Sequence, residues 1–566
     1  MMFLKSANSV FLSLLLLSTL CPCFYFLLYF GRIRILTINI LKSISMKKQK
    51  SSVVLTALIV ALGGFLMGFD ASVISGVIKF IEPEFNLSKI ELGWAVASLS
   101  LAATAGMIFA GPLSDRFGRT IVLKASALLY AFSAFLAALA PSFIILVTAR
   151  MLAGLGVGAS LILAPMYIAE ISPSDRRGKL VSFNQLNIVV GISVAFFTNY
   201  LIVHLSKSNA SWVETLKLKE YIWRWMLGIE FFPATIYFFL LLFIPQSPRW
   251  LVMKGRYDEA LKVMKRFDDD DNAEKVINEI KENVLKESAP KQKTPVKDLF
   301  LPAMKLVLTI GIVIAILQQI TGINSVFFYA PMIFEQSGIG TDAAFIQAIL
   351  VGLTNVVFTI LAMVLIDKLG RKPLLIIGIS FITISMFLLA YGFNTARYKL
   401  TDISVSKLPT EINKTQLAPI MNLTYKSDTE FKDVVKKVMG EDVEKKYESE
   451  FISASITMNP TLILIGILGF VAAFAVSLGP VMWVLFSELF PNAIRGTAIS
   501  FVGFINSAIS FLVQLVFPWE LATLGSSGTF LLYGIFALVG LAFIWKLLPE
   551  TKGRSLEELE AILVKK

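Results

Sequence analysis

Three ionisable side chains fall inside stretches of the sequence that are otherwise almost wholly apolar. Asp70 lies in the segment 52–78, Arg150 in 142–168 and Glu230 in 223–244. A carboxylate within hydrocarbon is costly and by default functional, because it can bind and release a proton there. Arg150 is the obvious partner of Asp70, and Glu230 is a second acid that can join them. The alternative is a static pair of Asp70 with Arg150 that only fixes helix packing.

A second set of polar side chains on apolar segments consists of amides and one tryptophan. The set is Gln185, Gln318, Gln319, Asn324, Asn355, Trp483 and Asn506. Amides both donate and accept hydrogen bonds, and an aromatic ring offers an apolar plane. Together they suit a sugar, which has a ring of hydroxyls and an apolar face.

The alternative for the amides is that they hold helices together, and for Asn355 alone both interpretations remain open. Gln318, Gln319 and Asn324 cannot all face lipid, and Gly322 would let the helix break near a ligand. Trp483 could be an interfacial anchor. Its place after Gly479-Pro480, where a helix kink is expected, favours a cavity instead.

The elements that must hold these side chains are membrane-spanning helices. Of the 566 residues, 56% are hydrophobic and 16% are charged, against about 45–50% and about 25% in soluble domains. A bilayer core about 30 Å thick needs about 20 apolar residues of helix. From Ser51 onward twelve segments qualify: 52–78, 92–113, 121–140, 142–168, 180–203, 223–244, 303–329, 343–366, 373–393, 459–486, 496–517 and 525–547. We therefore expect an all-α integral membrane protein.

Basic residues between these segments predict the orientation. Lys and Arg recur on one side, in the loops near residues 116–119, 176–179 and 368–372, and this side is cytoplasmic by the positive-inside rule. The formal net charge of +12 has the same explanation, so we expect no nucleic-acid partner. Both termini of the twelve-helix core are then cytoplasmic.

Four regions follow along the chain. Residues 1–45 carry an extra apolar run, which is either a thirteenth helix or an artefact of gene annotation with the true start at Met46. Residues 46–244 form a first half of six helices, 245–300 a charged amphipathic linker on the cytoplasmic side, and 301–566 a second half. The second half includes an external insertion at 394–458, in which residues 431–439 have the spacing of a small amphipathic helix.

The two halves repeat each other at their cytoplasmic loops. Asp-Arg-Phe-Gly-Arg at 115–119 corresponds to Asp-Lys-Leu-Gly-Arg at 367–371. Glu, Pro, Arg and Gly recur with equal spacing at 170–178 and 488–496. Topology alone explains the basic residues but not the repeated acids, so we expect carboxylate–arginine latches that break as the two halves move. The gating candidates are Asp115, Arg116, Arg119, Glu170, Arg177, Asp367, Arg371, Glu488 and Arg495.

Five motifs in this order resemble the sugar porter family of the major facilitator superfamily. They are GPLSDRFGR at 111–119, PQSPRWL at 245–251, QQITGIN at 318–324, GPVMWVLFSELFP at 479–491 and PETKGRS at 549–555. The resemblance implies the fold of that superfamily, with twelve transmembrane helices in two pseudo-symmetric halves. It also implies that the amides listed above line the sugar site, that the aspartate matching Asp70 couples transport to protons, and that the arginine matching Arg150 pairs with it.

The sequence thus predicts a proton-coupled symporter that imports a monosaccharide, either a hexose such as glucose or xylose, across the cell membrane by alternating access. An uncoupled facilitator and a non-transporting sugar sensor are the alternatives. Phe328, Ile192, Ser507 and Asn506 depart from the xylose-symporter pattern and leave the sugar open. Gln246 stands where the family has glutamate. We expect no enzyme activity, no metal site, no cofactor besides the coupling proton, and function as a monomer in the lipid bilayer.

Overall fold

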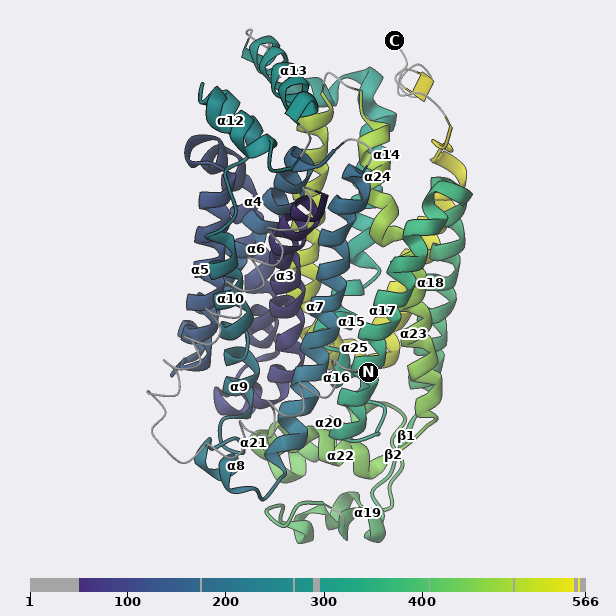
Figure 1. The fold of residues 1–566 in the computed structure, drawn as a ribbon. Helices are drawn as coiled ribbons and strands as arrows, with labels where there is room; N and C mark the ends of the chain where they lie inside the picture. Colours follow the sequence, from purple (N-terminus) through teal and green to yellow (C-terminus); the bar gives the residue numbers. More distant parts are fainter. Residues whose placement is uncertain are drawn as a thin grey trace, which may run out of the picture.

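The computed structural model describes residues 50–173, 176–267, 270–288, 296–406, 408–491, 494–553 and 558–559. Long helices form a bundle with a smaller layer at each end (Figure 1). We call the end that carries the segment 245–300 the linker end. The opposite end carries the segment 397–457, which we call the cap, and is the insertion end. The predicted apolar run within 1–45 lies outside the described residues.

The first half of the bundle covers the first six predicted spans. Its helices are α3 (Lys50–Glu84), α4 (Lys89–Phe117), α5 (Arg119–Ala138), α6 (Phe143–Ile171), α7 (Arg177–Ser206), the short α8 (Ser211–Thr215), α9 (Ile222–Gly228) and α10 (Phe231–Leu241). The sixth predicted span is divided between α9 and α10, and Glu230 lies at the break.

The second half covers the remaining predicted spans. Its helices are α14 (Lys305–Ile320), α15 (Ile323–Phe328), α16 (Ala330–Glu335), α17 (Thr341–Leu369), α18 (Arg371–Asn394), α23 (Pro460–Val476), α24 (Leu478–Leu489) and α25 (Arg495–Leu547). The kink predicted at Gly479-Pro480 is displaced to Ser477, where the helix breaks. Pro480 lies in the first turn of α24, whose N–H groups have no acceptor within the helix, so a proline there removes no helical hydrogen bond.

Eleven helices of the described chain are long and apolar enough to cross a membrane. The last of them, α25, has 53 residues and contains non-helical backbone at Gly525, so it holds both of the final predicted segments. Large apolar side chains such as Ile144, Ile384 and Trp545 are exposed on the bundle, as contact with lipid requires.

Small residues bring α3 and α7 into close contact. A Cβ atom on Gly68 would collide with the carbonyl oxygen of Ile188, and one on Gly191 would collide with the carbonyl oxygen of Phe65. Such contacts let two backbones approach in a membrane, where packing rather than the hydrophobic effect drives helix association. They fix the position of α3, which carries Asp70.

The layer at the linker end is helical, as the sequence predicts. It consists of α11 (Pro248–Met253), α12 (Tyr257–Met264) and α13 (Asp270–Ser288), which share a small apolar core around Trp250 and Met264. Two 3-10 turns, Val296–Phe300 and Pro302–Met304, lead from it into α14.

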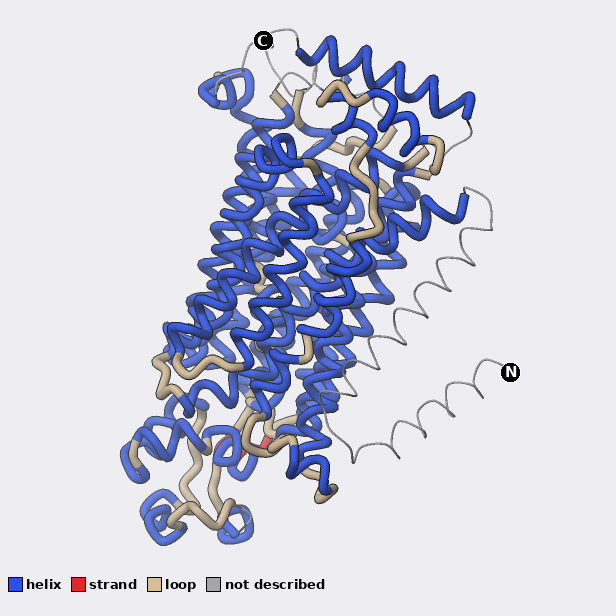
Figure 2. Tube along the Cα trace, turned by 60° about the vertical axis from the view of Figure 1, so that its left-hand side comes forward, coloured by secondary structure: helices blue, strands red, loops and turns tan. Residues whose placement is uncertain are grey.

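The cap at the insertion end has its own apolar core. It contains β1 (Arg397–Tyr398), α19 (Asp402–Ser406), a 3-10 turn (Lys414–Ile420), α20 (Asp428–Met439), α21 (Glu441–Lys446), α22 (Glu448–Ser455) and β2 (Ile456–Thr457). The strands pair antiparallel. The predicted amphipathic helix is α20, whose Phe431 and Val435 are buried in the cap core. Figure 2 shows the cap beyond the ends of the long helices.

Candidate functional site

Four of the predicted ligand-binding side chains form one hydrogen-bonded cluster. Gln319 Nε2 donates to Gln318 Oε1 at 3.1 Å and to Asn506 Oδ1 at 3.2 Å. Asn506 Nδ2 donates to Gln318 Oε1 at 2.8 Å, and Asn324 Nδ2 donates to Gln319 Oε1 at 2.8 Å. The amides of α14, α15 and α25 thus satisfy one another, and a hydroxylated ligand would have to exchange hydrogen bonds with them.

A break between two helices places these amides together. Gly322 has a φ of 89°, in the left-handed region that glycine adopts without strain, and it separates α14 from α15. A side chain at this position would also collide with the ring of Tyr533. The break turns Asn324 back toward Gln319, five residues earlier, as the sequence predicts for Gly322.

Two members of the cluster were not predicted from the sequence. Asn324 Nδ2 also donates to Ser510 Oγ at 2.7 Å, and Gln514 Nε2 donates to the same hydroxyl at 2.8 Å. Asn506, Ser510 and Gln514 follow one another at intervals of four residues, so they share one face of α25. That spacing is a signal by which the sequence could have identified both.

Gln514 extends the cluster into the other half of the bundle. Its Oε1 accepts a hydrogen bond of 2.9 Å from Ser100 Oγ of α4. We call Gln318, Gln319, Asn324, Asn506, Ser510 and Gln514 the polar cluster. A polar chain therefore runs from the second half to the first half.

The other three predicted ligand-binding residues lie outside this hydrogen-bonded set within the described chain. Asn355 is buried on α17, Gln185 is exposed on α7, and Trp483 is 49% exposed on α24. Trp483 nevertheless lies beside Gly503 of α25 and contacts Phe486 edge to face. Asn506 Nδ2 lies 3.7 Å from the sulfur of Met482, the residue before Trp483.

The three ionisable residues predicted to couple transport to protons are buried in the first half. Asp70 is 4% exposed, Arg150 2% and Glu230 3%. Arg150 Nη1 lies 3.4 Å from Asp70 Oδ1, and Arg150 interacts electrostatically with Glu230 as well. The sequence therefore identified a charged group that the fold brings together from α3, α6 and the break between α9 and α10.

This charged group is incompletely satisfied. Asp70 Oδ2, Arg150 Nε and Nη2, and Glu230 Oε1 are buried and have no hydrogen-bond partner within the described part of the chain. A buried ion pair that served only to fix helix packing would need its remaining donors and acceptors satisfied to be stable. Unsatisfied buried groups of this kind are uncommon and need an explanation, such as a bound water, a bound ion or a functional role.

Carboxylate–arginine pairs of the kind predicted from the repeat are present at the linker end, two in the first half and one in the second. Arg119 lies 2.8 Å from Asp115 and 3.4 Å from Glu170, and Arg371 lies 2.7 Å from Glu488. These three ion pairs each join residues of the same half, so in this conformation they brace each half internally.

The remaining gating candidates differ in what surrounds them. Arg116 stacks over the ring of Phe117, and Arg495 Nε donates to the carbonyl oxygen of Phe490. Arg177 is exposed at the start of α7. Asp367 lies in α17, and its side chain is outside what the structure describes.

The repeat extends to Gln246 and Glu550, which were not among the predicted gating candidates. Each accepts hydrogen bonds just after a glycine that joins two helices, Gly118 with a φ of 100° and Gly370 with a φ of 94°. Gln246 Oε1 accepts from the N–H of Thr120 at 3.3 Å, and Glu550 accepts from the N–H groups of Arg371 and Lys372 at 3.1 and 3.0 Å. Gln246 and Glu550 each follow a proline after the last helix of their half. Gln246 therefore keeps a hydrogen bond at the start of α5, where the family usually has a carboxylate.

Comparison with known proteins agrees with this architecture. The model of the family described as "Sugar (and other) transporter" matches residues 56–406 and 446–563. The chain is 33% identical over 513 residues to the arabinose-proton symporter of Bacillus subtilis (strain 168), covering 91% of this chain and 95% of that protein. It is 34% identical over 541 residues to the D-xylose-proton symporter of Escherichia coli (strain K12), covering 89% and 94%.

Solved structures of the E. coli xylose transporter XylE share the fold. The inward open conformation superposes with a TM-score of 0.67 at 31% identity, covering 90% of this chain and all of that chain. The complex of XylE with 6-bromo-6-deoxy-D-glucose gives 0.64 at 32% identity, covering 91% and 100%. The chain is a membrane-embedded transporter rather than an enzyme, and it belongs to the sugar porter family of the major facilitator superfamily.

Proposed function

We propose that the protein is a proton-coupled symporter that imports a monosaccharide, either a hexose such as glucose or a pentose such as xylose. The observation that carries the proposal is the buried, incompletely satisfied pair of Asp70 and Arg150 beside Glu230. A carboxyl group that gains and loses a proton at this position changes whether Arg150 has an anionic partner. Two of the relatives are named as proton symporters of arabinose and xylose, which supports the same function here.

The polar cluster is the proposed sugar site. Its amides donate and accept in one place, and Trp483 with its large exposed ring supplies an apolar surface nearby. Phe328 and Ile192 are buried and their side chains have no polar atom, so hydroxyl recognition is assigned to the cluster.

The proposed cycle is alternating access with a single chain as the working unit in the cell membrane. We assign the linker end to the cytoplasm, because basic loops gather there. Sugar and proton bind from outside, protonation of Asp70 frees Arg150, and the halves rock so that the linker end opens. The ion pairs around Glu170 and Glu488 then rearrange as the gate of that end.

Uptake into proteoliposomes under an imposed inward proton gradient tests this function. Labelled glucose, xylose, galactose and arabinose are compared with and without a protonophore. We expect one sugar to accumulate and the accumulation to collapse with the protonophore. Asp70→Asn should still equilibrate the sugar but not concentrate it, whereas Asp402→Asn, the same change at an exposed position of the cap, should leave accumulation unchanged.

Three outcomes would exclude parts of the proposal. Concentration of sugar by Asp70→Asn would exclude Asp70 as the coupling group. Equilibration without accumulation by the unsubstituted protein would identify an uncoupled facilitator. Binding of a sugar without any uptake would identify the sensor instead.

A further inference from the structure

Most of the cap lies outside the family model. That model leaves residues 407–445 unmatched between its two matched parts, which include both ends of the cap and Glu448. Within the cap, Tyr398 stacks on Phe431 with ring centroids 5.7 Å apart, and Phe451 is buried in the same core. A segment with its own core moves as one body, so its contacts with each half of the bundle can be considered separately.

The cap is fixed to the second half. Both of its ends continue into helices of that half, α18 and α23. The Asp428 carboxylate accepts hydrogen bonds from the N–H and the hydroxyl of Ser526, at 3.1 and 3.0 Å, beside the break in α25. Gly338 lies so close to Ile456 that a Cβ atom there would collide with its side chain. Covalent links, backbone contacts and close packing all hold the cap on this side.

Contacts with the first half have a different character, because the polar ones within the described chain are ion pairs and one lysine–amide hydrogen bond between side chains. Lys89 at the start of α4 lies 3.4 Å from Glu448 Oε2, and Lys79 of α3 lies 3.8 Å from Glu450. Lys445 Nζ donates to Asn86 Oδ1 at 3.5 Å. These distances are at the long end for charged hydrogen bonds, which suits contacts that form and separate.

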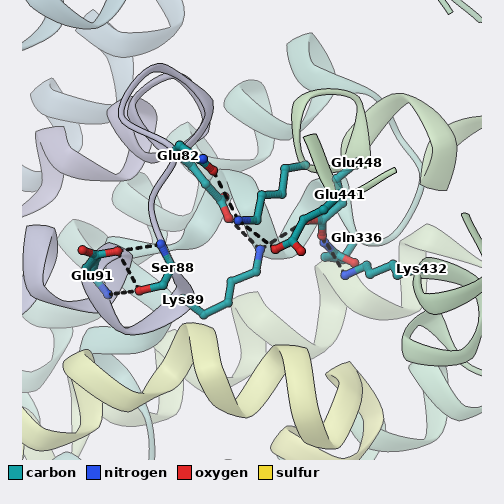
Figure 3. Close-up of polar contacts among 10 residues, drawn as sticks. Glu82, Ser88, Lys89, Glu91, Gln336, Lys432, Glu441 and Glu448 are labelled. Atoms are coloured by element: carbon teal, nitrogen blue, oxygen red, sulfur yellow. Dashed lines mark hydrogen bonds and ion pairs between the residues drawn. The ribbon is translucent and has the colours of Figure 1, made fainter. Parts of the chain in front are cut away.

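Glu448 is the junction of the two halves and the cap (Figure 3). Its Oε1 accepts from Lys432 Nζ of the cap at 2.7 Å and from Gln336 Nε2 of the second half at 2.9 Å, while its Oε2 faces Lys89 of the first half. A cavity of about 50 Å³ remains beside it, where the cap meets both halves. That volume holds at most a few waters, so the cap and both halves lie close together at this junction.

Separation of Lys89 from Glu448 leaves neither charge without a partner. Lys89 Nζ keeps Glu82 of its own half at 2.7 Å, and Glu448 keeps Lys432 and Gln336. Breaking a buried pair is expensive when it strands a charge, and this arrangement avoids that cost. The seam between the cap and the first half can therefore open and close reversibly.

We propose that the cap is a permanent part of the second half and a releasable lock on the first half, which holds the insertion end closed through Lys89 and Glu448. The proposal rests on the alternating-access cycle above. When the insertion end opens, the cap leaves with the second half, and the Lys89–Glu448 contact breaks. The lock thus adds to the direct ion pairs between the halves, Lys79 with Glu335 and Lys207 with Asp342, in keeping the insertion end closed.

Distances between three spin labels test this movement without any sugar or gradient. The labels are placed on the exposed residues Ile90 of α4, Asp442 of the cap and Thr523 of α25, in pairs, in the full chain in liposomes with Cys21 and Cys23 replaced by serine. Opening should lengthen the distances from Ile90 to Asp442 and from Ile90 to Thr523 together. The distance from Asp442 to Thr523 should stay constant.

Lys89→Gln weakens the lock and should raise the ratio of long to short Ile90–Asp442 distances about tenfold, the change that about 1.4 kcal/mol produces. Lys436→Gln is the matched control, because Lys436 is exposed and pairs with Glu441 inside the cap. Glu82→Gln controls for the second contact of Lys89 and should not raise the ratio.

An unchanged ratio in Lys89→Gln, or an equal rise in Lys436→Gln or Glu82→Gln, would overturn the lock. A change in the Asp442–Thr523 distance on opening would overturn the assignment of the cap to the second half. Failure of the transport function appears instead in the uptake assay, with these distances still measurable, so the two proposals fail separately.

Discussion

Replacing Gln319 by leucine separates ligand binding by the polar cluster from a role in holding helices together. Gln319 donates to Gln318 and Asn506 and accepts from Asn324. Gln318 Oε1 keeps Asn506 Nδ2 as a donor, and Asn324 Nδ2 keeps Ser510 as an acceptor. Asn506 Oδ1, in a side chain that is 6% exposed, loses the donor that the described chain gives it.

The loss of stability can be estimated from these hydrogen bonds. A buried acceptor left without a donor costs about 1–3 kcal/mol, and a replaced hydrogen bond about 1 kcal/mol. We therefore expect Gln319→Leu to lower the free energy of unfolding by about 2–4 kcal/mol. Adding Asn506→Leu removes the stranded acceptor but takes away the remaining donor to Gln318 Oε1, so the double variant should be destabilised by about the sum of the singles.

Asn355→Leu provides the matched control, since Asn355 is a buried amide outside the polar cluster. Its effect should add to that of Gln319→Leu within about 0.5 kcal/mol. Chemical denaturation in detergent measures these stabilities, and calorimetric titration with the transported sugar measures affinity. If the cluster binds sugar, Gln319→Leu should weaken binding by about 10- to 100-fold, as expected for about 1–3 kcal/mol. Unchanged affinity of the folded variant would refute a ligand role and leave helix packing as the function of Gln319.

Three further predictions concern the breaks in the helices and the cap. Gly322→Ala should lower the thermal stability, with a cost of about 1–3 kcal/mol for the left-handed backbone and a further cost from collision with Tyr533, whereas Gly111→Ala, with nothing within 4 Å, should have a small effect. Asp428→Asn should destabilise the cap by about 1–3 kcal/mol, because its contacts with Ser526 lose their charge, and hydrogen exchange of the cap amides measures this. Burial raises the pKa of Glu444 from 4.5 to about 7, so the folded cap binds a proton that the unfolded chain has released; cap stability should fall as the pH rises from about 4.5 to about 7, and Glu444→Gln should flatten that dependence in hydrogen exchange at several pH values. An unchanged pH dependence in Glu444→Gln would assign the effect to other groups.

Membrane spans were predictable from the sequence because the bilayer sets both their length and their composition. Buried ionisable residues were equally visible, since Asp70 and Arg150 contrast with apolar neighbours. Helix breaks were predicted by region rather than by residue. Gly322 was identified by its type, and the last two predicted segments meet near Gly525, whose backbone is non-helical, but the break expected at Gly479-Pro480 occurs at Ser477. A break depends on which carbonyl groups find tertiary partners, and local sequence does not specify this.

Contacts between distant parts of the chain were not predictable. Lys89 and Glu448 are 359 residues apart, and Ser100 and Gln514 are 414 apart. No periodicity relates such distant positions. In the sequence, the charges of the insertion cannot be distinguished from those of any solvent-exposed helix, and only the fold places them against α4. Ser510 and Gln514 are an exception, because their spacing from Asn506 on one helix face was present in the sequence.

The two strands that begin and end the cap have a consequence for how this chain could have acquired it. Tyr398 pairs directly with Ile456, and such antiparallel partners have Cα atoms about 4.5–5.5 Å apart. The chain therefore leaves and re-enters the connection between α18 and α23 at nearly one point. Loop-closure entropy grows only logarithmically, by about 0.6 kcal/mol for each doubling of length, so an insertion of this size burdens folding little. A tight two-residue turn could replace everything between the strands without moving either helix, which makes the cap a module that evolution or protein engineering can add, exchange or remove.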